Sequence, residues 1–164
     1  MMTKSELNNS KQAKNRRSAA RLAAVQALYE LDFVNANVNL VLEYFLAKRW
    51  PLCDSNSNKD LILIEPDREW LKVLVKGVTR SRAELDTIIE PALNEKWTID
   101  RLETLLRVIL QSAVFELNYK PNIPASVIIN EYLDVTHAFF EGPEKKLVNG
   151  VLDRLARDLR TEEL

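Results

Sequence analysis

Glycine occurs only three times in the 164 residues of this chain, and this scarcity limits the folds that it can adopt. β-Sandwiches and β-barrels need many tight turns, and glycine is the residue that most readily adopts the backbone angles of such turns. A chain of this length normally forms one domain or two small subdomains around a shared core. The sequence therefore predicts an all-α fold.

Apolar residues recur at intervals of three and four in several segments, which is the spacing of one buried face of an α-helix. The strongest pattern runs through Leu105, Leu106, Ile109, Leu110 and Ala113. The segments predicted to be helical are about Arg16 to Asn35, Leu40 to Trp50, Asp67 to beyond Val78, Glu84 to Leu93, Leu102 to Leu117, Pro124 to about Gly142, and Glu144 to about Arg160. We therefore expect a compact bundle of about seven helices.

Two interruptions of this pattern carry further expectations. Gly77 lies inside a predicted helix, where glycine costs up to about 1 kcal/mol relative to alanine, so we expect that another helix approaches closely there. Residues 52–66 are predicted to form the longest internal loop, with a polar centre around Asp54 and Asn58.

The charges are distributed unevenly along the chain. Residues 1–21 contain six bases and one acid, a net charge of +5, whereas the other 143 residues contain 17 bases and 23 acids, a net charge of −6. Clustered Lys and Arg side chains gain entropy by releasing counterions from phosphates, so a basic segment favours an anionic partner such as nucleic acid. The alternative is a solvated tail that only aids solubility.

The basic charge is predicted to continue from a tail into a helix. Residues 1–15 are polar and lack an apolar period, so we expect them to form a disordered basic arm ahead of a helical domain at 16–164. Arg16, Arg17 and Arg21 precede the larger apolar residues of the first predicted helix, and we expect their guanidinium groups to reach solvent together.

Several kinds of chemistry are disfavoured by the residues present. Cys53 and His137 are the only cysteine and histidine, so a zinc site of the Cys/His type cannot be assembled and no catalytic role for His137 is expected. The glycine-rich loops that cradle nucleotide phosphates are also absent from the sequence. Neither an apolar run long enough to span a membrane nor an apolar secretion signal occurs, so we expect a cytoplasmic protein without a cofactor.

Four segments resemble the NusB family of transcription antitermination factors in sequence, order and spacing. They are Arg16 to Tyr29, Arg107 to Leu110 with Phe115 to Leu117, Pro124 to Glu131, and Leu147 to Asp153. The resemblance extends from Arg16 to about Leu159. It implies an all-α protein of two helical subdomains, which would cover about residues 16–94 and 98–160 here.

The resemblance also implies a function. Members of the family are not enzymes; they bind RNA. They pair with NusE, a protein of the small ribosomal subunit, and the pair recognises single-stranded boxA RNA in nascent ribosomal transcripts. The complex then helps RNA polymerase to pass terminators.

Transferred to this chain, the resemblance assigns RNA contacts to the basic opening and, more weakly, to a pair of lysines near the C-terminal signature. The residues are Lys14, Arg16, Arg17 and Arg21 in the first group, and Lys145 and Lys146 in the second. The first group agrees with the charge distribution described above. Arginine suits the role because its planar fork binds phosphate through two hydrogen bonds and also stacks on unpaired bases.

Two other interpretations stay open. NusB-like domains also precede the catalytic domain of some RNA methyltransferases, although this chain contains no glycine-rich cofactor motif. A third interpretation is an assembly protein whose basic arm is occluded in a homodimer. The sequence does not distinguish a monomer from a homodimer.

Overall fold

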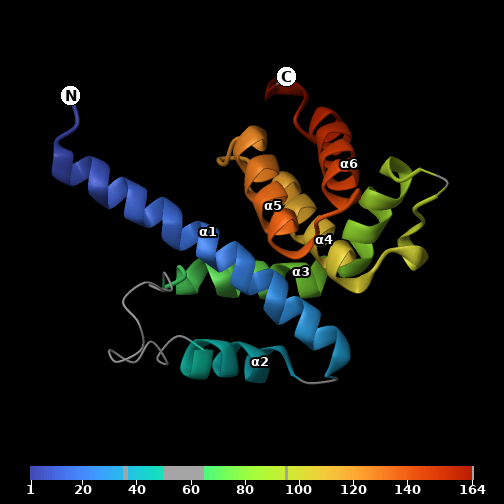
Figure 1. Cartoon of the computed structure of the whole chain (residues 1–164), viewed down its shortest axis with the longest axis horizontal. Helices are drawn as coiled ribbons and strands as arrows, with labels where there is room; N and C mark the ends of the chain where they lie inside the picture. The colour runs from blue at the N-terminus through green and yellow to red at the C-terminus, as the bar shows by residue number, and fades with distance from the viewer. Residues whose placement is uncertain (35–36, 50–64, 95, 164) are drawn as a thin grey trace. The chain divides into compact units, whose positions relative to one another are not determined.

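The computed structural model describes residues 1–34, 37–49, 65–94 and 96–163. The predicted loop at 52–66 and Cys53 therefore fall almost entirely outside the described residues. Six α-helices are present in the described part: α1 (Lys4–Phe33), α2 (Val38–Tyr44), α3 (Arg68–Ile89), α4 (Thr104–Tyr119), α5 (Ala125–Phe139) and α6 (Glu144–Leu159). Shorter helical turns cover Phe45–Arg49, Glu90–Ala92, Ile99–Arg101 and Thr161–Glu163. The predicted all-α class is confirmed (Figure 1).

The number of helices is slightly lower than the predicted seven because two predicted segments form one helix. α3 continues from Arg68 to Ile89 without a break near Glu84. Its buried residues keep their helical spacing through this region, from Val78 to Leu85 to Ile89. Pro91 follows in the short turn Glu90–Ala92, where its ring no longer interrupts the α-helix.

The first helix begins twelve residues earlier than predicted, so the expectation of a disordered arm at residues 1–15 is wrong for the helical part of that segment. A capping box starts α1. The Thr3 hydroxyl accepts a hydrogen bond from the Glu6 backbone N–H at 3.2 Å, and the Glu6 carboxylate accepts one from the Thr3 N–H at 2.7 Å. The Thr3 backbone N–H, and after it the Thr3 hydroxyl that donates to the same carboxylate at 2.9 Å, hold the pKa of Glu6 below its usual value. Local capping therefore starts a helix that the apolar pattern does not reveal.

The described chain divides into two compact units, Met1–Val75 and Lys76–Leu164, whose boundary lies inside α3. The sequence placed the division at residues 94–98 instead. A polar connection suggested a boundary there, whereas α3 carries the chain from the first unit into the second without leaving helical structure.

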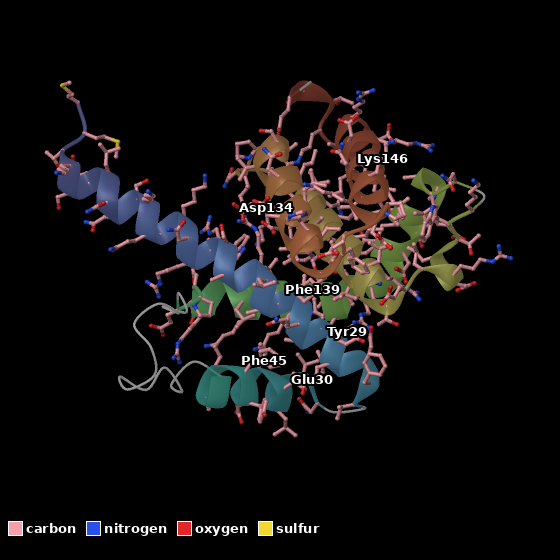
Figure 2. All side chains as sticks on the ribbon, in the orientation of Figure 1. Tyr29, Glu30, Phe45, Asp134, Phe139 and Lys146 are labelled. Carbon is pink, nitrogen blue, oxygen red and sulfur yellow. The ribbon has the colours of Figure 1, made fainter. Side chains whose placement is uncertain are left out.

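The first unit contains α1, α2 and the first turns of α3. α1 packs against α2, and its buried side chains are mostly small, including Ala20, Ala23, Ala24 and Ala27. Small side chains allow neighbouring elements to come close to the helix. Phe45, which follows α2, is fully buried and is the largest buried side chain among the described residues of this unit (Figure 2).

The second unit is built around α4. Nearly every residue of this helix from Leu106 to Leu117 is buried, and both α5 and α6 pack against it (Figure 1). Gly77 faces the same helix: a Cβ atom added to Gly77 would lie 2.2 Å from Cζ of Phe115. The prediction that Gly77 marks a close helix approach is confirmed.

Arg160 closes the second unit at the end of α6. Its buried guanidinium donates to the backbone carbonyls of Leu117 at 2.7 Å, Lys120 at 2.8 Å and Ile123 at 3.0 Å, and it pairs with Glu163. The last carbonyls of a helix have no partner within the helix. Arg160 therefore caps the C-terminal end of α4 and the connection that follows.

Candidate nucleic-acid interface

The basic part of α1 is held in place by the start of α3. The backbone N–H of Asp67 donates to the carbonyl of Arg16 at 2.9 Å. The Asp67 carboxylate then accepts a hydrogen bond from the backbone N–H of Trp70 at 3.1 Å, which caps the first turn of α3. These two bonds fix the first turn of α3 against α1 at Arg16, within the first unit.

This junction brings an aromatic ring under an arginine. Cζ of Arg17 lies 4.5 Å from the centroid of the Trp70 ring, a cation–π contact. Trp70 is half-buried, whereas Arg17 is exposed. A cation–π contact is an electrostatic attraction between the charge and the ring, and it is not a hydrogen bond. Trp70 therefore helps to hold the exposed Arg17 in position on α1.

The exposed bases of this region do not all share one side of the helix. Lys14, Arg16 and Arg17 are exposed. Residues three apart on a helix are neighbours, whereas residues two apart point in opposite directions. Lys14 and Arg17 therefore share one side of α1, and Arg16 projects from the other side.

Arg21 differs from the prediction. Its exposed fraction is only 2%, so the expectation that it reaches solvent together with Arg16 and Arg17 is wrong. Arg21 lies one turn further along α1, where the neighbouring Ala20, Ala23 and Ala24 are all buried. A side chain in this packed stretch is not accessible to RNA, and we remove Arg21 from the candidate interface.

Lys145 and Lys146 are exposed and lie in the second unit, on the first turn of α6. Figure 2 labels Lys146 on this helix. Positive charges near the N-terminus of a helix are unfavourable by about 0.3–1 kcal/mol each, because the helix dipole places partial positive charge there. The two predicted groups of bases belong to different compact units.

Sequence reasoning missed Trp70 and Asp67 as parts of the interface. Both residues fall in the segment predicted to be helical from Asp67 to beyond Val78, and neither was given a role in binding. The signal that points to them is an acidic residue at the start of a predicted helix, followed three residues later by a tryptophan. Neighbouring bases are already paired with acids, Arg68 with Glu65 at 2.9 Å and Lys72 with Glu69 at 3.3 Å.

Two further findings bear on the kinds of site that the sequence disfavoured. Within the described residues, no group of three or more His, Cys, Asp and Glu side chains is arranged to hold a metal ion. No helix in the same part of the chain is both long and apolar enough to cross a membrane. His137 lies on the exposed last turn of α5.

Comparison with known proteins gives a consistent result at the level of sequence. Residues 18–157 match the NusB family. The chain is 39% identical over 147 residues to the transcription antitermination protein NusB of Bartonella tribocorum, covering 89% of this chain and 91% of that protein. It is 40% identical over 149 residues to the protein of the same name from Rhizobium johnstonii, covering 90% of each.

The solved structures agree with the sequence matches. NusB of T. maritima superposes with a TM-score of 0.70 at 27% identity, covering 87% of this chain and 91% of that one. A chain in a crystal structure of the antitermination factors NusB and NusE in complex with dsRNA superposes with a TM-score of 0.70 at 26% identity, covering 88% of this chain and 98% of that one. Because the family match spans most of the chain and the relatives exceed 30% identity over nine-tenths of it, this chain belongs to the NusB family.

Proposed function

We propose that this protein is an RNA-binding transcription antitermination factor that acts together with NusE. The observation that carries the proposal beyond family membership is the exposed Arg17, which is held over Trp70 beside Lys14 at the basic end of the chain. The relatives are named as antitermination proteins, and one similar structure contains NusB, NusE and RNA. The RNA partner is single-stranded boxA RNA of nascent ribosomal transcripts, and the complex helps RNA polymerase to pass terminators.

The chemistry of the interface fits single-stranded RNA. Arg17 donates to phosphate oxygens through two N–H groups at once, and Lys14 adds a point charge on the same side of α1. The half-buried ring of Trp70, next to Arg17, supplies an aromatic surface for an unpaired base. Arg16, on the other side of α1, and Lys145 with Lys146 on α6 are secondary candidates for phosphate contacts.

The charge of the rest of the chain supports a division of roles. Residues 22–164 carry a net charge of −6, which repels RNA from most of the surface. The same acidic surface attracts a basic partner, and NusE supplies one. Binding of NusE then lengthens the positively charged path that the RNA follows.

Substitution of Arg17 by alanine tests the proposal. Loss of a charge-assisted phosphate contact costs about 1.5–3 kcal/mol, so we expect boxA affinity to fall about 10- to 150-fold. The slope of log affinity against log salt should shrink by about 0.7 for each lost contact with single-stranded RNA. The measurement is a titration of boxA and scrambled RNA over a range of salt concentrations, with and without NusE.

Arg154→Ala is the matched control, because Arg154 is exposed on α6 and its removal changes the net charge by the same amount. Trp70→Phe keeps a ring under Arg17 and should lose less affinity than Trp70→Ala. If Arg17→Ala binds boxA as tightly as Arg154→Ala, with the same salt slope and in the presence of NusE, then Arg17 has no role in RNA binding.

The other interpretations have separate tests. The relatives named as NusB match over about nine-tenths of their own length, which disfavours a methyltransferase domain. We expect no enzymatic activity and action in the cytoplasm. A homodimer that occludes the basic end predicts that added boxA RNA does not change the elution volume in gel filtration, whereas an accessible site predicts a shift to a larger complex.

A further inference from the structure

The first turns of α1 extend beyond the packed part of the first unit. The start of α3 meets α1 at Arg16, and every residue from Met1 to Arg17 is exposed. Figure 1 shows these turns as the N-terminal part of one continuous helix. The segment from Lys4 to Asn15 thus forms a helical extension of α1.

The composition of this helical extension gives it little stability of its own. It contains Ser5, Asn8, Asn9 and Ser10, which are weaker helix formers than alanine, lysine or glutamate. A helix that is polar on all sides gains no burial energy, and most helical stability in proteins comes from such burial. Within the extension, the capping box at Thr3 and Glu6 is therefore the main local contribution to helix stability, and a binding partner would add to it.

One side of the extension is positively charged. At 3.6 residues per turn, Lys4 and Lys11 point within roughly 20° of each other, and Lys14 follows within roughly 60° of Lys11. We call Lys4, Lys11 and Lys14 the lysine stripe. It rises about 15 Å along the helix, and Arg17 follows Lys14 one turn later with a further rotation of roughly 60°, so the basic residues wind gradually around α1 and Arg17 lies roughly 140° from Lys4. The one acid of the extension, Glu6, is engaged with Thr3 in the capping box.

The residues of the extension fit a polyanion better than another helix. Leu7 and Ala13 are its only apolar residues, so it lacks the repeated apolar seam that a second copy of the chain would need. Paired lysines at i and i+7 and at i and i+3 repel each other in an isolated helix, and phosphates relieve this repulsion. The lysine stripe is also continuous with the proposed interface at Lys14 and Arg17.

We propose that Lys4 and Lys11 extend the RNA site along the phosphates of nucleotides that flank boxA, without sequence preference, and that this contact stabilises the helical extension. The proposal rests on the RNA-binding function proposed above and concerns two residues outside that interface. Lysine suits the task because its ammonium group is a mobile point charge that contacts phosphates but does not read bases in a fixed geometry.

The experiment compares the double substitution Lys4→Gln and Lys11→Gln with a control in which Lys96→Gln and Arg101→Gln remove the same charge from exposed positions of the second unit. Each protein is titrated, in the presence of NusE, with a minimal boxA RNA and with the same RNA lengthened at either end by uridines. We expect lengthening at one end to strengthen binding by the wild-type and control proteins but not by the Lys4/Lys11 variant. All three should bind the minimal RNA equally.

Salt dependence and hydrogen exchange give independent readouts. Loss of two phosphate contacts should reduce the salt slope for the lengthened RNA by about 1.4, so the affinity lost between about 50 and about 200 mM salt becomes about 7-fold smaller. The lengthened RNA should slow amide exchange in residues 4–14 of the wild-type protein and leave it unchanged in the Lys4/Lys11 variant.

The two proposals fail in different ways. Equal binding of the lengthened RNA by the Lys4/Lys11 variant and the control would overturn the role of the lysine stripe, and the function would stand if Arg17→Ala still weakened binding to the minimal RNA. If the wild-type protein bound neither RNA in the presence of NusE, the RNA-binding function and the extended site would both be refuted.

Discussion

A methyl group added at Gly77 tests how closely α3 and α4 pack in the second unit. The new Cβ would lie 2.2 Å from Cζ and 2.5 Å from Cε2 of Phe115, whereas ordinary contact begins near 3.4 Å. The ring would have to move by about 1 Å. Phe115 is only 6% exposed, and the centroid of its ring lies 5.2 Å from the centroid of the Tyr119 ring, so the Phe115 ring has little room to move.

Two opposing contributions decide the sign of the stability change. Replacing a helical glycine by alanine stabilises the helix by up to about 1 kcal/mol, whereas overpacking a buried site costs about 1–3 kcal/mol. Because the ring is confined, we expect Gly77→Ala to lower the free energy of unfolding by about 1–2 kcal/mol. For a chain of this length, about 2–4 °C per kcal/mol corresponds to a Tm lower by about 2–8 °C.

Gly150 provides the matched control. It also lies within a helix, α6, but a Cβ atom added there would have no neighbour within 4 Å. Gly150→Ala should therefore raise the free energy of unfolding by about 0.5–1 kcal/mol. Urea unfolding followed by circular dichroism measures both variants, and adding Phe115→Leu to Gly77→Ala should recover part of the loss. An increase in stability for Gly77→Ala equal to that for Gly150→Ala would refute the close packing.

Three further predictions concern polar contacts of the second unit. Arg160→Met leaves the buried carbonyls at the end of α4 without their donor, so it should lower the free energy of unfolding by at least about 2 kcal/mol. Urea titrations measure this loss, and almost no change would mean that Arg160 behaves as an exposed arginine. The pKa of Glu163 is lowered, first by the backbone N–H of Ala125 and then by Arg160. The stabilising effect of the Glu163 carboxylate is therefore present above the pKa of an unfolded glutamate and is lost as the pH falls through the lower folded value. The difference in free energy of unfolding between wild type and Glu163→Gln should shrink from about pH 7 to about pH 3, and a constant difference would contradict this cause. The pKa of Tyr119 is raised because its hydroxyl donates to Glu84. The stabilising effect of the neutral phenol is therefore lost only as the pH rises through the raised value. Ultraviolet titration should show Tyr119 ionising at lower pH in Glu84→Gln, and an unchanged titration would exclude this partner.

Periodic segments allowed most of the helices to be predicted from the sequence. α4, α5 and α6 begin and end within a few residues of the predicted positions because each has a continuous apolar stripe and a proline or polar residue near an end. The start of α1 was missed because it depends on the local Thr3–Glu6 capping box rather than on burial. The single helix α3 was divided in the prediction because the polar and charged residues from Thr79 to Arg82 interrupt the apolar pattern.

The candidate site was predictable in its charge and not in its geometry. Arg17 and Arg21 are both basic and lie four residues apart, yet one is exposed and the other is 2% exposed. The difference arises from the depth of packing along α1. The position of Trp70 under Arg17 likewise depends on a tertiary contact between segments that are distant in the sequence, and no local pattern specifies such a contact. Arg160 illustrates the same limit, because a basic residue at the end of a surface helix gives no sign that it caps another helix.

The enclosure of α4 has a consequence for the dynamics of the molecule. A backbone amide exchanges its hydrogen with water only when its hydrogen bond opens, and a helix that is covered on nearly all sides opens only when its neighbours separate from it. The amides of α4 should therefore be the slowest to exchange in the second unit and should report its global unfolding. Exchange in the uncovered first turns of α1 reports only local fraying, so one deuterium-labelling experiment separates these two processes.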